Sequence, residues 1–277
     1  MPEGDTIFRA ARTLEKALAG KRVTRFETGL AQLARVNDDA PLVGRMIHSV
    51  AARGKHLLMA FSGDLILRTH MRMNGSWHIY RPQEPWQRAR ARLRVLVGTE
   101  DFVAVGFDVP IAEFETARSL ARVDDVRLLG PDLLAETFDV AEAKRRLLAR
   151  GDTSVGEALL NQRVLAGVGN VFKSEVCFSV GVNPFLPVRG LTGAEVDGLL
   201  KTAEKFLRAN ILEGKADGVL TYTGMRRTTG RGDPTERLWV YGRSGKPCRK
   251  CATPIAFAKQ GLEARVTYWC PRCQPNG

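Results

Sequence analysis

The stretch Cys248–Arg249–Lys250–Cys251, which residues 252–269 separate from Cys270–Pro271–Arg272–Cys273, decides how this chain is interpreted. A Cys-x-x-Cys pair turns the backbone so that both sulfur atoms face one point, and two pairs supply the tetrahedral shell that structural Zn²⁺ prefers. The run Arg265–Val266–Thr267–Tyr268–Trp269 and a turn candidate at Gly261 predict a β-hairpin between the pairs. The sequence therefore predicts a hairpin bound to one structural Zn²⁺. The predicted ligands are Cys248, Cys251, Cys270 and Cys273.

The alternative for these four cysteines is two disulfides in a secreted protein, and the start of the chain argues against it. Met1–Asp5 is acidic, and the helix pattern that follows contains Arg9 and Arg12 in place of the uninterrupted apolar core of a secretory signal. No apolar run approaches the roughly 20 residues that span a membrane. The fifth cysteine, Cys177, is predicted to be a buried thiol. We therefore expect a cytoplasmic protein with no membrane partner.

The charge of the chain is large and unevenly distributed. The chain has 277 residues, 44% of them hydrophobic and 26% charged, which suits a globular protein with two domains. The formal net charge is +12, and residues 214–250 hold nine Lys/Arg against three acidic residues. A basic segment beside a zinc hairpin is typical of a surface that binds a polyanion. A solvated basic surface is the alternative, which would be favoured if the charge were scattered.

Hydrophobic periodicity divides the chain into a strand-rich and a helix-rich part. Apolar residues recur at helical spacing over 6–19, with Asp5 as the expected N-cap and Gly20 as the stop. Close turns then separate short strand-like runs, which favours an antiparallel β-sandwich over a βαβ fold. The runs are Arg22–Thr28, Met46–Arg53, His56–Phe61, Asp64–His70, Ser76–Tyr80, Arg92–Val97 and Phe102–Phe107.

Helical patterns dominate the second half, so the expected fold class is α+β. The predicted helices are Glu113–Val123, Val140–Arg150, Val155–Gln162, Val171–Val180 and Ala194–Glu213. Residues 214–237 are polar and rich in glycine, which predicts a long mobile loop. We expect a β-sandwich domain at 1–125, a helical domain at 126–237 and a zinc-finger hairpin at 238–277.

One helical join, residues 160–171, contains a turn with two glycines, Gly167 and Gly169, directly before Asn170. Glycine lets the backbone approach a ligand closely, and the start of the next helix offers free N–H groups that favour an anion. The plain role for Asn170 is to cap the N-terminus of the next helix and nothing more. The alternative, a DNA phosphate held by the turn, is favoured because a basic segment follows.

These features together resemble the family of DNA glycosylase/AP lyases that includes formamidopyrimidine-DNA glycosylase and endonuclease VIII. The resemblance spans nearly the whole chain, and the opening Pro-Glu-Gly is similar to the endonuclease VIII branch. Five motifs in the family's order carry it. They are Met1–Thr6, Arg53–Leu57, His70–Trp77, the helix–two-turn–helix-like join 160–175, and Val240–Arg243 with the zinc hairpin that closes in Cys270–Gln274.

The first motif can be interpreted chemically. Removal of Met1 would leave Pro2 with a secondary α-amine, a group that titrates at about 8 and is partly neutral near pH 7. Such an amine can attack C1′ of a deoxynucleotide and form an iminium, or Schiff base. Glu3 is adjacent and can act as an acid or base on the opening sugar. The resemblance implies both roles, while a start trimmed by a peptidase is the plain alternative.

The resemblance assigns further residues. It implies that Lys55 binds phosphate and assists β-elimination, that Arg265 contacts the lesion phosphate and assists δ-elimination, and that Asn170 holds phosphate with Lys55. The turn Arg72–Met73–Asn74 resembles the wedge that fills the gap left by a flipped nucleotide, with a plain hairpin tip as the alternative. Two departures stand out. Residues 102–110 lack the Arg-x-Phe pair of the formamidopyrimidine branch, and Thr6 replaces an acidic residue of some endonuclease VIII members.

The expected function is therefore a bifunctional DNA glycosylase and AP lyase of base excision repair. We expect it to remove oxidised bases, pyrimidines above all, and to nick the strand by β- or β,δ-elimination. The expected partner is damaged DNA, duplex or single-stranded, and the expected setting is the nucleoid of a bacterial cytoplasm, with the protein a monomer. Two alternatives from other classes are a non-catalytic or lyase-only structure-specific DNA-binding protein and a zinc-ribbon protein that binds RNA or ribosomes.

Overall fold

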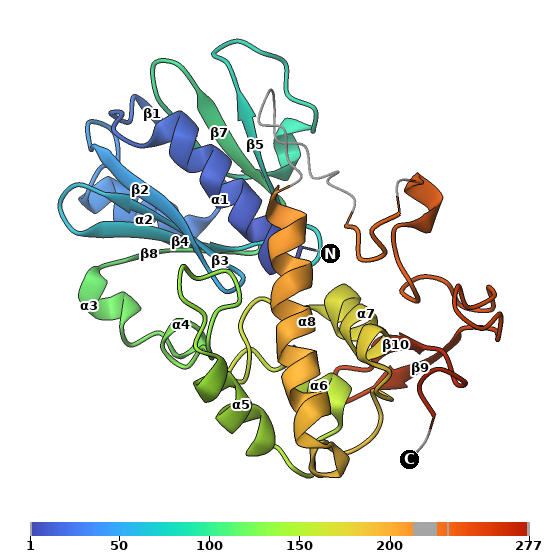
Figure 1. The fold of residues 1–277 in the computed structure, drawn as a ribbon. Helices are drawn as coiled ribbons and strands as arrows, with labels where there is room; N and C mark the ends of the chain where they lie inside the picture. The colour runs from blue at the N-terminus through green and yellow to red at the C-terminus, as the bar shows by residue number, and fades with distance from the viewer. Residues whose placement is uncertain (1, 213–225, 232, 276–277) are drawn as a thin grey trace. The chain divides into compact units, whose positions relative to one another are not determined.

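A computed structural model describes residues 2–212, 226–231 and 233–275 (Figure 1). These residues form two compact units, one up to residue 128 and one from residue 129 onward, and each is described by itself. Within the described ranges no helix is both long enough and apolar enough to cross a membrane. The three-domain division stays a prediction.

The first unit combines one long helix with eight strands. Its elements are α1 (Gly4–Leu18), β1 (Arg25–Thr28), α2 (Ala31–Asp39), β2 (Ile47–Arg53), β3 (His56–Phe61), β4 (Leu65–His70), β5 (Ser76–Tyr80), a 3₁₀ turn (Arg90–Arg92), β6 (Leu93–Gly98), β7 (Val103–Phe107), β8 (Ile111–Glu115), α3 (Ala117–Leu120) and α4 (Asp124–Arg127). The expected antiparallel sandwich is confirmed, and the predicted strands agree with β1 to β7 within a few residues.

Two four-stranded antiparallel sheets share one apolar core, with strand orders β1–β6–β7–β5 and β2–β3–β4–β8. Residues of both sheets and of α1 line this core, among them Leu14, Met59 and Trp77. A second apolar cluster lies on the other side of the first sheet, where Trp86 packs on Phe107 with ring centroids 5.7 Å apart. Because apolar side chains cover both faces, every residue of β5 and β7 is buried.

Helix α1 begins at Gly4, ahead of the predicted residue 6. Glu3 is the N-cap residue, and its carbonyl accepts hydrogen bonds from the N–H groups of Thr6 (3.0 Å) and Ile7 (3.1 Å). Asp5, predicted as the cap, lies buried inside the first turn, 3.7 Å from the guanidinium of Arg9. The Asp5 prediction was wrong because the helical hydrogen bonds already begin at Glu3.

The segment after β7 differs most from the prediction. The expected helix at Glu113–Val123 is wrong over its first part, because residues 111–115 form β8 and pair with β4. Helix begins only at α3, where Thr116 and Ser119 form a capping box. Helix α2 was not predicted at all. Its nine residues carry a single buried side chain, Leu33, so the apolar period is too weak to detect.

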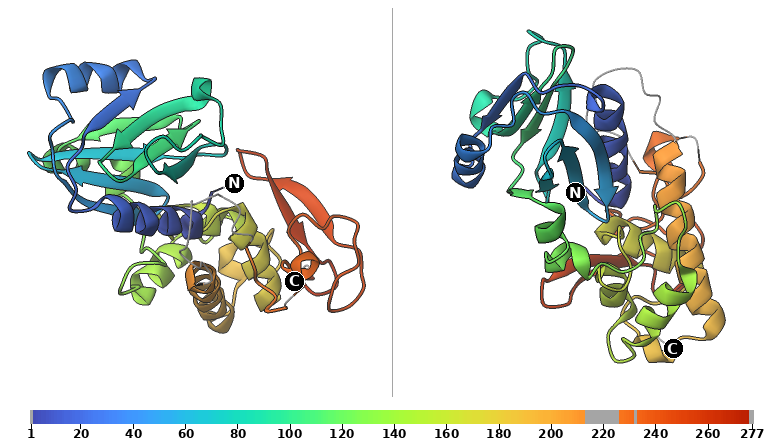
Figure 2. Two further views of the ribbon diagram at one scale, coloured as in Figure 1. Left: turned by 90° about the horizontal axis from the view of Figure 1, so that it is seen from above. Right: turned by 90° about the vertical axis from the view of Figure 1, so that its left-hand side faces the viewer.

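The second unit is helical and ends in a two-stranded hairpin. Its elements are α5 (Val140–Leu148), α6 (Val155–Leu160), α7 (Asn170–Val180), a 3₁₀ turn (Val188–Gly190), α8 (Gly193–Leu212), a 3₁₀ turn (Pro234–Glu236), β9 (Ala256–Gln260) and β10 (Arg265–Trp269). Helix α7 is buried from Asn170 to Phe178 because α8, α6 and β10 pack around it (Figure 2). In the hairpin Arg265 lies opposite Gln260 and Trp269 opposite Ala256.

Candidate active site and metal centre

Pro2 and Glu3 are buried, and the Glu3 side chain is 0% exposed. Both precede the first turn of α1, whose apolar face is locked in the core of the first unit by Ile7 and Leu14. The positive end of the helix dipole favours a carboxylate at this position. The chain therefore holds a carboxyl group and the adjacent proline on a rigid element, which a nucleophile and its proton-transfer partner require.

Lys55 lies in the tight turn between β2 and β3, beside Gly54. Gly54 has φ +58°, a conformation that favours glycine and that a two-residue hairpin turn requires. The next residue, His56, lies opposite His70 in the β3–β4 ladder, and their rings are 4.9 Å apart. The pairing brings the Lys55 turn to the same end of the sheet as the turn that follows His70.

That second turn carries Arg72, Met73 and Asn74, all exposed, with 59% of the Met73 side chain accessible. Gly75 closes it, because its N–H donates to the Met71 carbonyl (2.9 Å) and an added Cβ would lie 2.6 Å from that oxygen. Arg72 has the positive φ of +47°, and its N–H donates to Nδ1 of His70 (3.0 Å). The turn thus presents a polar, an apolar and an amide side chain from a fixed backbone.

Three histidines of the first unit are held neutral. Burial, followed by the positive charge of Arg68, lowers the pKa of His56 to about 4. Burial, followed by the neighbouring His56, lowers the pKa of His70 to about 3, and burial followed by Arg88 lowers that of His78 to about 4. His78 also shares hydrogen bonds with the hydroxyls of Ser76 (3.1 Å) and Tyr80 (3.3 Å). Neutral imidazoles therefore belong to the folded core.

These histidines predict that the first unit loses stability in mild acid. The unfolded chain takes up protons below its His pKa of about 6.5, whereas the folded chain resists them down to about 4. The free energy of unfolding should stay level above pH 7 and fall as the pH drops from 6.5, by roughly 1.4 kcal/mol per histidine at pH 5.5. Scanning calorimetry should show a melting temperature several degrees lower at pH 5.5 than at pH 7.5.

Two variants test the cause of that shift. His78→Gln removes one buried imidazole and should flatten the pH dependence, while His48→Gln, at an exposed position of β2, should leave it unchanged. An identical slope in wild type and His78→Gln would contradict the assignment.

In the second unit, the turn before α7 is held by one side chain. The Gln162 amide donates to the carbonyls of Leu160 (2.7 Å) and Val168 (2.9 Å), and its oxygen accepts the N–H of Gly167 (3.1 Å). Gly167 has φ +102°, so the turn needs a glycine there. Sequence reasoning did not single out Gln162, although its position directly before the two glycines was visible.

Asn170 is the first residue of α7, and Gly169 is the N-cap residue. The alternative role of Asn170 as an N-cap is therefore wrong, and its phosphate contact stays a prediction. Its amide instead donates to the Val266 carbonyl in β10 (2.7 Å), and its own Oδ1 is buried without a hydrogen-bond partner among the described residues. This bond brings Asn170 beside the strand that Arg265 begins.

Arg265 is half-buried at the start of β10 and pairs with Glu263 across the hairpin turn. Its Nη2 lies 2.7 Å and its Nε 2.9 Å from Oε2 of Glu263. Glu263 is 74% exposed, so the attraction is screened by water and is worth at most about 1 kcal/mol. A phosphate could therefore displace it.

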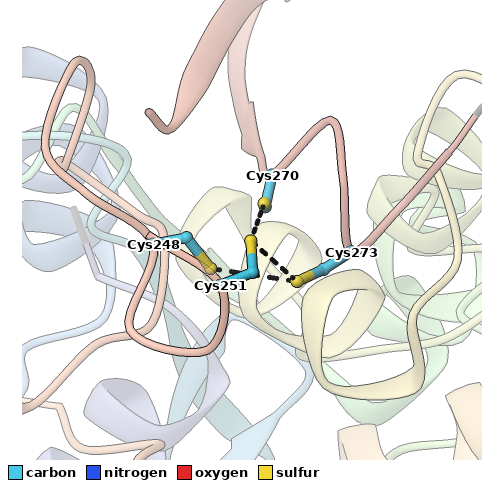
Figure 3. A group of neighbouring side chains, drawn as sticks. All are labelled: Cys248, Cys251, Cys270 and Cys273. Carbon is cyan, nitrogen blue, oxygen red and sulfur yellow. Dashed lines mark hydrogen bonds between the residues drawn. The ribbon is translucent and has the colours of Figure 1, made fainter. Parts of the chain in front are cut away.

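The four predicted zinc ligands gather at one point (Figure 3). All four sulfur atoms lie within 4.8 Å of one another, and the distances Cys248–Cys273, Cys251–Cys270 and Cys251–Cys273 are 3.9, 3.4 and 3.5 Å. A Zn²⁺ ion bound at about 2.3 Å to each sulfur requires edges of about 3.8 Å, so the arrangement fits a tetrahedral site. Cys177 lies elsewhere, fully buried in α7, and burial raises its pKa to about 12.

Glu175 ties α7 to the segment that leads into the metal centre. Its carboxylate accepts a hydrogen bond from the hydroxyl of Thr228. It also accepts hydrogen bonds from three consecutive N–H groups, those of Trp239, Val240 and Tyr241, and each of these three is 2.8 Å long. Glu175 therefore links α7 to residue 228 and to residues 239–241. Burial raises the pKa of Glu175.

The basic segment also contributes to this link. Arg249 donates to Glu236 (2.9 Å) and to two carbonyls, and Arg243 donates to the carbonyls of Trp239 and Pro247. These two cations therefore have structural partners, which their positions in the sequence did not reveal. Of the predicted mobile loop 214–237, residues 214–225 and 232 lie outside the described residues. In the described part, the Arg227 N–H donates to Asn210 Oδ1 (2.8 Å). The mobile loop itself stays a prediction.

Three family models match successive parts of the chain. The Formamidopyrimidine-DNA glycosylase N-terminal domain matches residues 1–107, the Formamidopyrimidine-DNA glycosylase H2TH domain matches 129–221, and the zinc finger found in FPG and IleRS matches 245–276. Among solved structures, one described as MutM in complex with carbocyclic 8-oxo-G containing DNA has a TM-score of 0.82 at 23% identity, covering 99% of this chain and all of that one, and shows the same fold.

Full-length relatives define the branch. A probable endonuclease 8 2 of Streptomyces coelicolor is 42% identical over 99% of this chain and 94% of its own length. Endonuclease 8 2 of Mycobacterium tuberculosis is 38% identical and endonuclease 8 of Escherichia coli 32% identical, each covering 99% of this chain and 100% of its own. The chain belongs to the formamidopyrimidine-DNA glycosylase/endonuclease VIII family. It is an endonuclease VIII-like DNA glycosylase and AP lyase, with one structural Zn²⁺ as its cofactor.

Proposed function

We propose that this chain removes oxidised pyrimidine bases from DNA through a Schiff base at Pro2 and then cuts the strand by β,δ-elimination. The observation that carries the proposal is the buried carboxyl group of Glu3 directly beside Pro2, at the N-terminus of a helix fixed in the core. The names of the relatives, endonuclease 8 and DNA-(apurinic or apyrimidinic site) lyase, support the same reaction class.

The reaction follows from these two groups. The lone pair of the Pro2 nitrogen attacks C1′, the bond from C1′ to the base breaks, and the base leaves with the electron pair and a proton. Glu3 donates a proton to O4′ as the sugar opens to the iminium. Loss of a C2′ proton then expels the 3′ phosphate, and loss of a C4′ proton expels the 5′ phosphate. Water releases the sugar fragment and regenerates the amine.

DNA contacts are proposed for the residues around these steps. Lys55, Asn170 and Arg265 bind phosphates, and the turn Arg72–Met73–Asn74 fills the gap left by the extruded nucleotide. The β7–β8 turn is fixed by ion pairs of Asp108 with Arg92 (2.7 Å) and Arg88 (3.5 Å). This anchoring and the missing Arg-x-Phe pair favour the 72–74 turn as wedge and disfavour 8-oxoguanine as substrate.

Borohydride trapping tests the proposal. Wild-type protein is mixed with duplexes that contain thymine glycol, 5-hydroxycytosine, 8-oxoguanine, uracil or an abasic site. We expect covalent adducts with the abasic and oxidised-pyrimidine duplexes, and products that carry phosphate at both new ends. Tight binding without adduct or cleavage would instead identify a structure-specific DNA-binding protein.

The phosphate contacts predict strongly salt-dependent binding. Each phosphate that is neutralised should add about −0.9 to the slope of log affinity against log salt concentration. Lys55→Ala should make this slope shallower by about that amount, as measured by anisotropy with a duplex that carries a tetrahydrofuran abasic analogue. Lys16→Ala, an exposed lysine of α1, is the matched control and should keep the wild-type slope. Equal slopes for Lys55→Ala and wild type would exclude Lys55 as a contact.

A further inference from the structure

Helix α7 is hydrogen-bonded to β10 through three side chains on one of its faces. Asn170, Lys173 and Ser174 are spaced so that they share a helix face, and they meet three successive strand residues, 266, 267 and 268. The Asn170 amide donates to the Val266 carbonyl at 2.7 Å, the Lys173 ammonium donates to the Thr267 hydroxyl at 2.6 Å, and Ser174 Oγ accepts the N–H of residue 268 at 3.4 Å. The helix therefore fixes the strand residue by residue.

Lys173 is the unusual member of this set, because its side chain is 0% exposed. A buried ammonium is unfavourable unless its donors are satisfied and its charge is balanced. An all-buried helix in the second unit could have held an apolar residue here, as its neighbours Val171, Phe172 and Val176 do. The burial of a charged lysine at this position therefore needs an explanation, which its hydrogen-bond partners provide.

From Lys173 a hydrogen-bonded chain leads to a carboxylate. The Thr267 hydroxyl donates to Gln260 Oε1 (2.7 Å), the Gln260 amide donates to Ser154 Oγ (2.8 Å), and the Ser154 hydroxyl donates to Glu157 Oε2 (2.5 Å). Every donor points the same way, from the ammonium to the carboxylate, so each bond polarises the next. We call the set Lys173, Thr267, Gln260, Ser154 and Glu157 the Lys173–Glu157 chain.

Two glycines, Gly156 and Gly261, lie close to side chains of the Lys173–Glu157 chain. A Cβ at Gly156 would lie 2.4 Å from Gln260 Oε1, and one at Gly261, where φ is +71°, would lie 2.7 Å from Glu157 Oε1. A side chain at position 156 would displace the Gln260 amide from this hydrogen-bonded chain, and the positive φ at position 261 favours glycine. The Gln260 amide makes a second bond, to the Pro184 carbonyl (2.7 Å).

Two members of the Lys173–Glu157 chain, Gln260 and Thr267, lie next to Arg265 in the hairpin. Gln260 lies directly opposite Arg265 in the hairpin ladder, and Thr267 lies two residues further along the same strand, on the same face. We propose that the Lys173–Glu157 chain is a positioning device that holds Arg265 in register for a DNA phosphate. This inference rests on the proposed function of Arg265. The Glu263 contact is exposed and screened by water, whereas the buried hydrogen-bonded chain fixes the backbone on both strands.

Thr267→Val tests the proposal because valine keeps the shape of threonine and removes the hydroxyl in the middle of the chain. Binding is measured with a tetrahydrofuran-containing duplex, which needs no catalysis. We expect roughly tenfold weaker binding, a shallower salt slope and a full zinc content. Thr267→Ser keeps the hydroxyl and should restore affinity to within about twofold of wild type.

Combination with Arg265→Ala separates positioning from general stability. If the chain acts through Arg265, Thr267→Val should weaken binding in the wild type and have no further effect in the Arg265→Ala background. Additive losses, or wild-type affinity for Thr267→Val, would overturn the positioning role. Wild-type affinity for Arg265→Ala alone would instead overturn the proposed function of Arg265.

Ser154→Ala covers the case in which Thr267→Val fails to fold. It breaks the chain near its half-buried end, leaves the Lys173–Thr267 bond intact, and should weaken binding several-fold with normal zinc content. That loss should also disappear in the Arg265→Ala background. Unchanged affinity for a folded Ser154→Ala would contradict the proposal.

Discussion

A Pro2→Gly protein should lose borohydride trapping on abasic duplex by about 100-fold or more, since covalent catalysis depends on this amine. The pyrrolidine ring fixes the backbone at the nucleophile and gives an iminium without an N–H, so the adduct stays charged as an electron sink. Glycine offers a primary amine on a backbone with far greater freedom, and its imine needs a separate proton. Gel analysis of the covalent adduct measures the effect directly.

The control for this prediction is a proline in the same unit that has no chemical role. Pro82 is exposed in the segment after β5, so Pro82→Gly should trap as wild type does and should melt at nearly the same temperature. If Pro2→Gly trapped at the wild-type rate while folded, Pro2 would not be the nucleophile, and a lysine amine would become the candidate.

A Cys270→Ser protein should lose its zinc and with it the hairpin. The apolar cluster around the metal is small, and two of its five buried members, Cys248 and Cys270, are ligands themselves. Structural Zn²⁺ contributes about 10–16 kcal/mol to the folding of comparable small modules, far more than this cluster can replace. Arg265 and the strand that Asn170 binds would then lose their place, so affinity for damaged duplex should fall at least about 100-fold.

Cys177→Ala is the matched control for the metal prediction. It removes a fully buried thiol of α7 that lies outside the metal site, and so tests sulfur loss without zinc loss. Zinc content by colorimetric release should be one per chain in Cys177→Ala and close to zero in Cys270→Ser. Normal DNA affinity in a zinc-free Cys270→Ser protein would refute the structural role of the hairpin in binding.

The elements that could be predicted from the sequence are those defined by the spacing of neighbouring residues. The period of α1 appears directly in the spacing of Ile7, Leu14 and Leu18, and the cysteine spacing defined the metal site before any fold was known. Tertiary pairing decided the rest. Residues 113–115 were predicted as helix because glutamate is tolerated there, yet they pair with β4 as part of the strand 111–115.

The contacts of the predicted site residues could not be read from the sequence. Asn170 binds Val266, which is far away in the sequence, so no local pattern could show that bond. The same holds for Lys173 and Thr267, whose pairing depends on how the hairpin packs on α7. Arg249 reads as a DNA-binding charge until the structure shows it paired with Glu236.

The exposed turn after β4 separates the residues that the fold needs from the residues that it leaves in solvent. Met71 is buried, Gly75 is fixed by its lack of a side chain, and the three residues between them leave most of their surface in solvent. Selection can therefore exchange the residues at 72–74 with little effect on the fold, so long as position 72 tolerates a positive φ. If the turn is the proposed wedge, its three exposed side chains can be varied to change what the protein does with a lesion while the surrounding sheet stays the same.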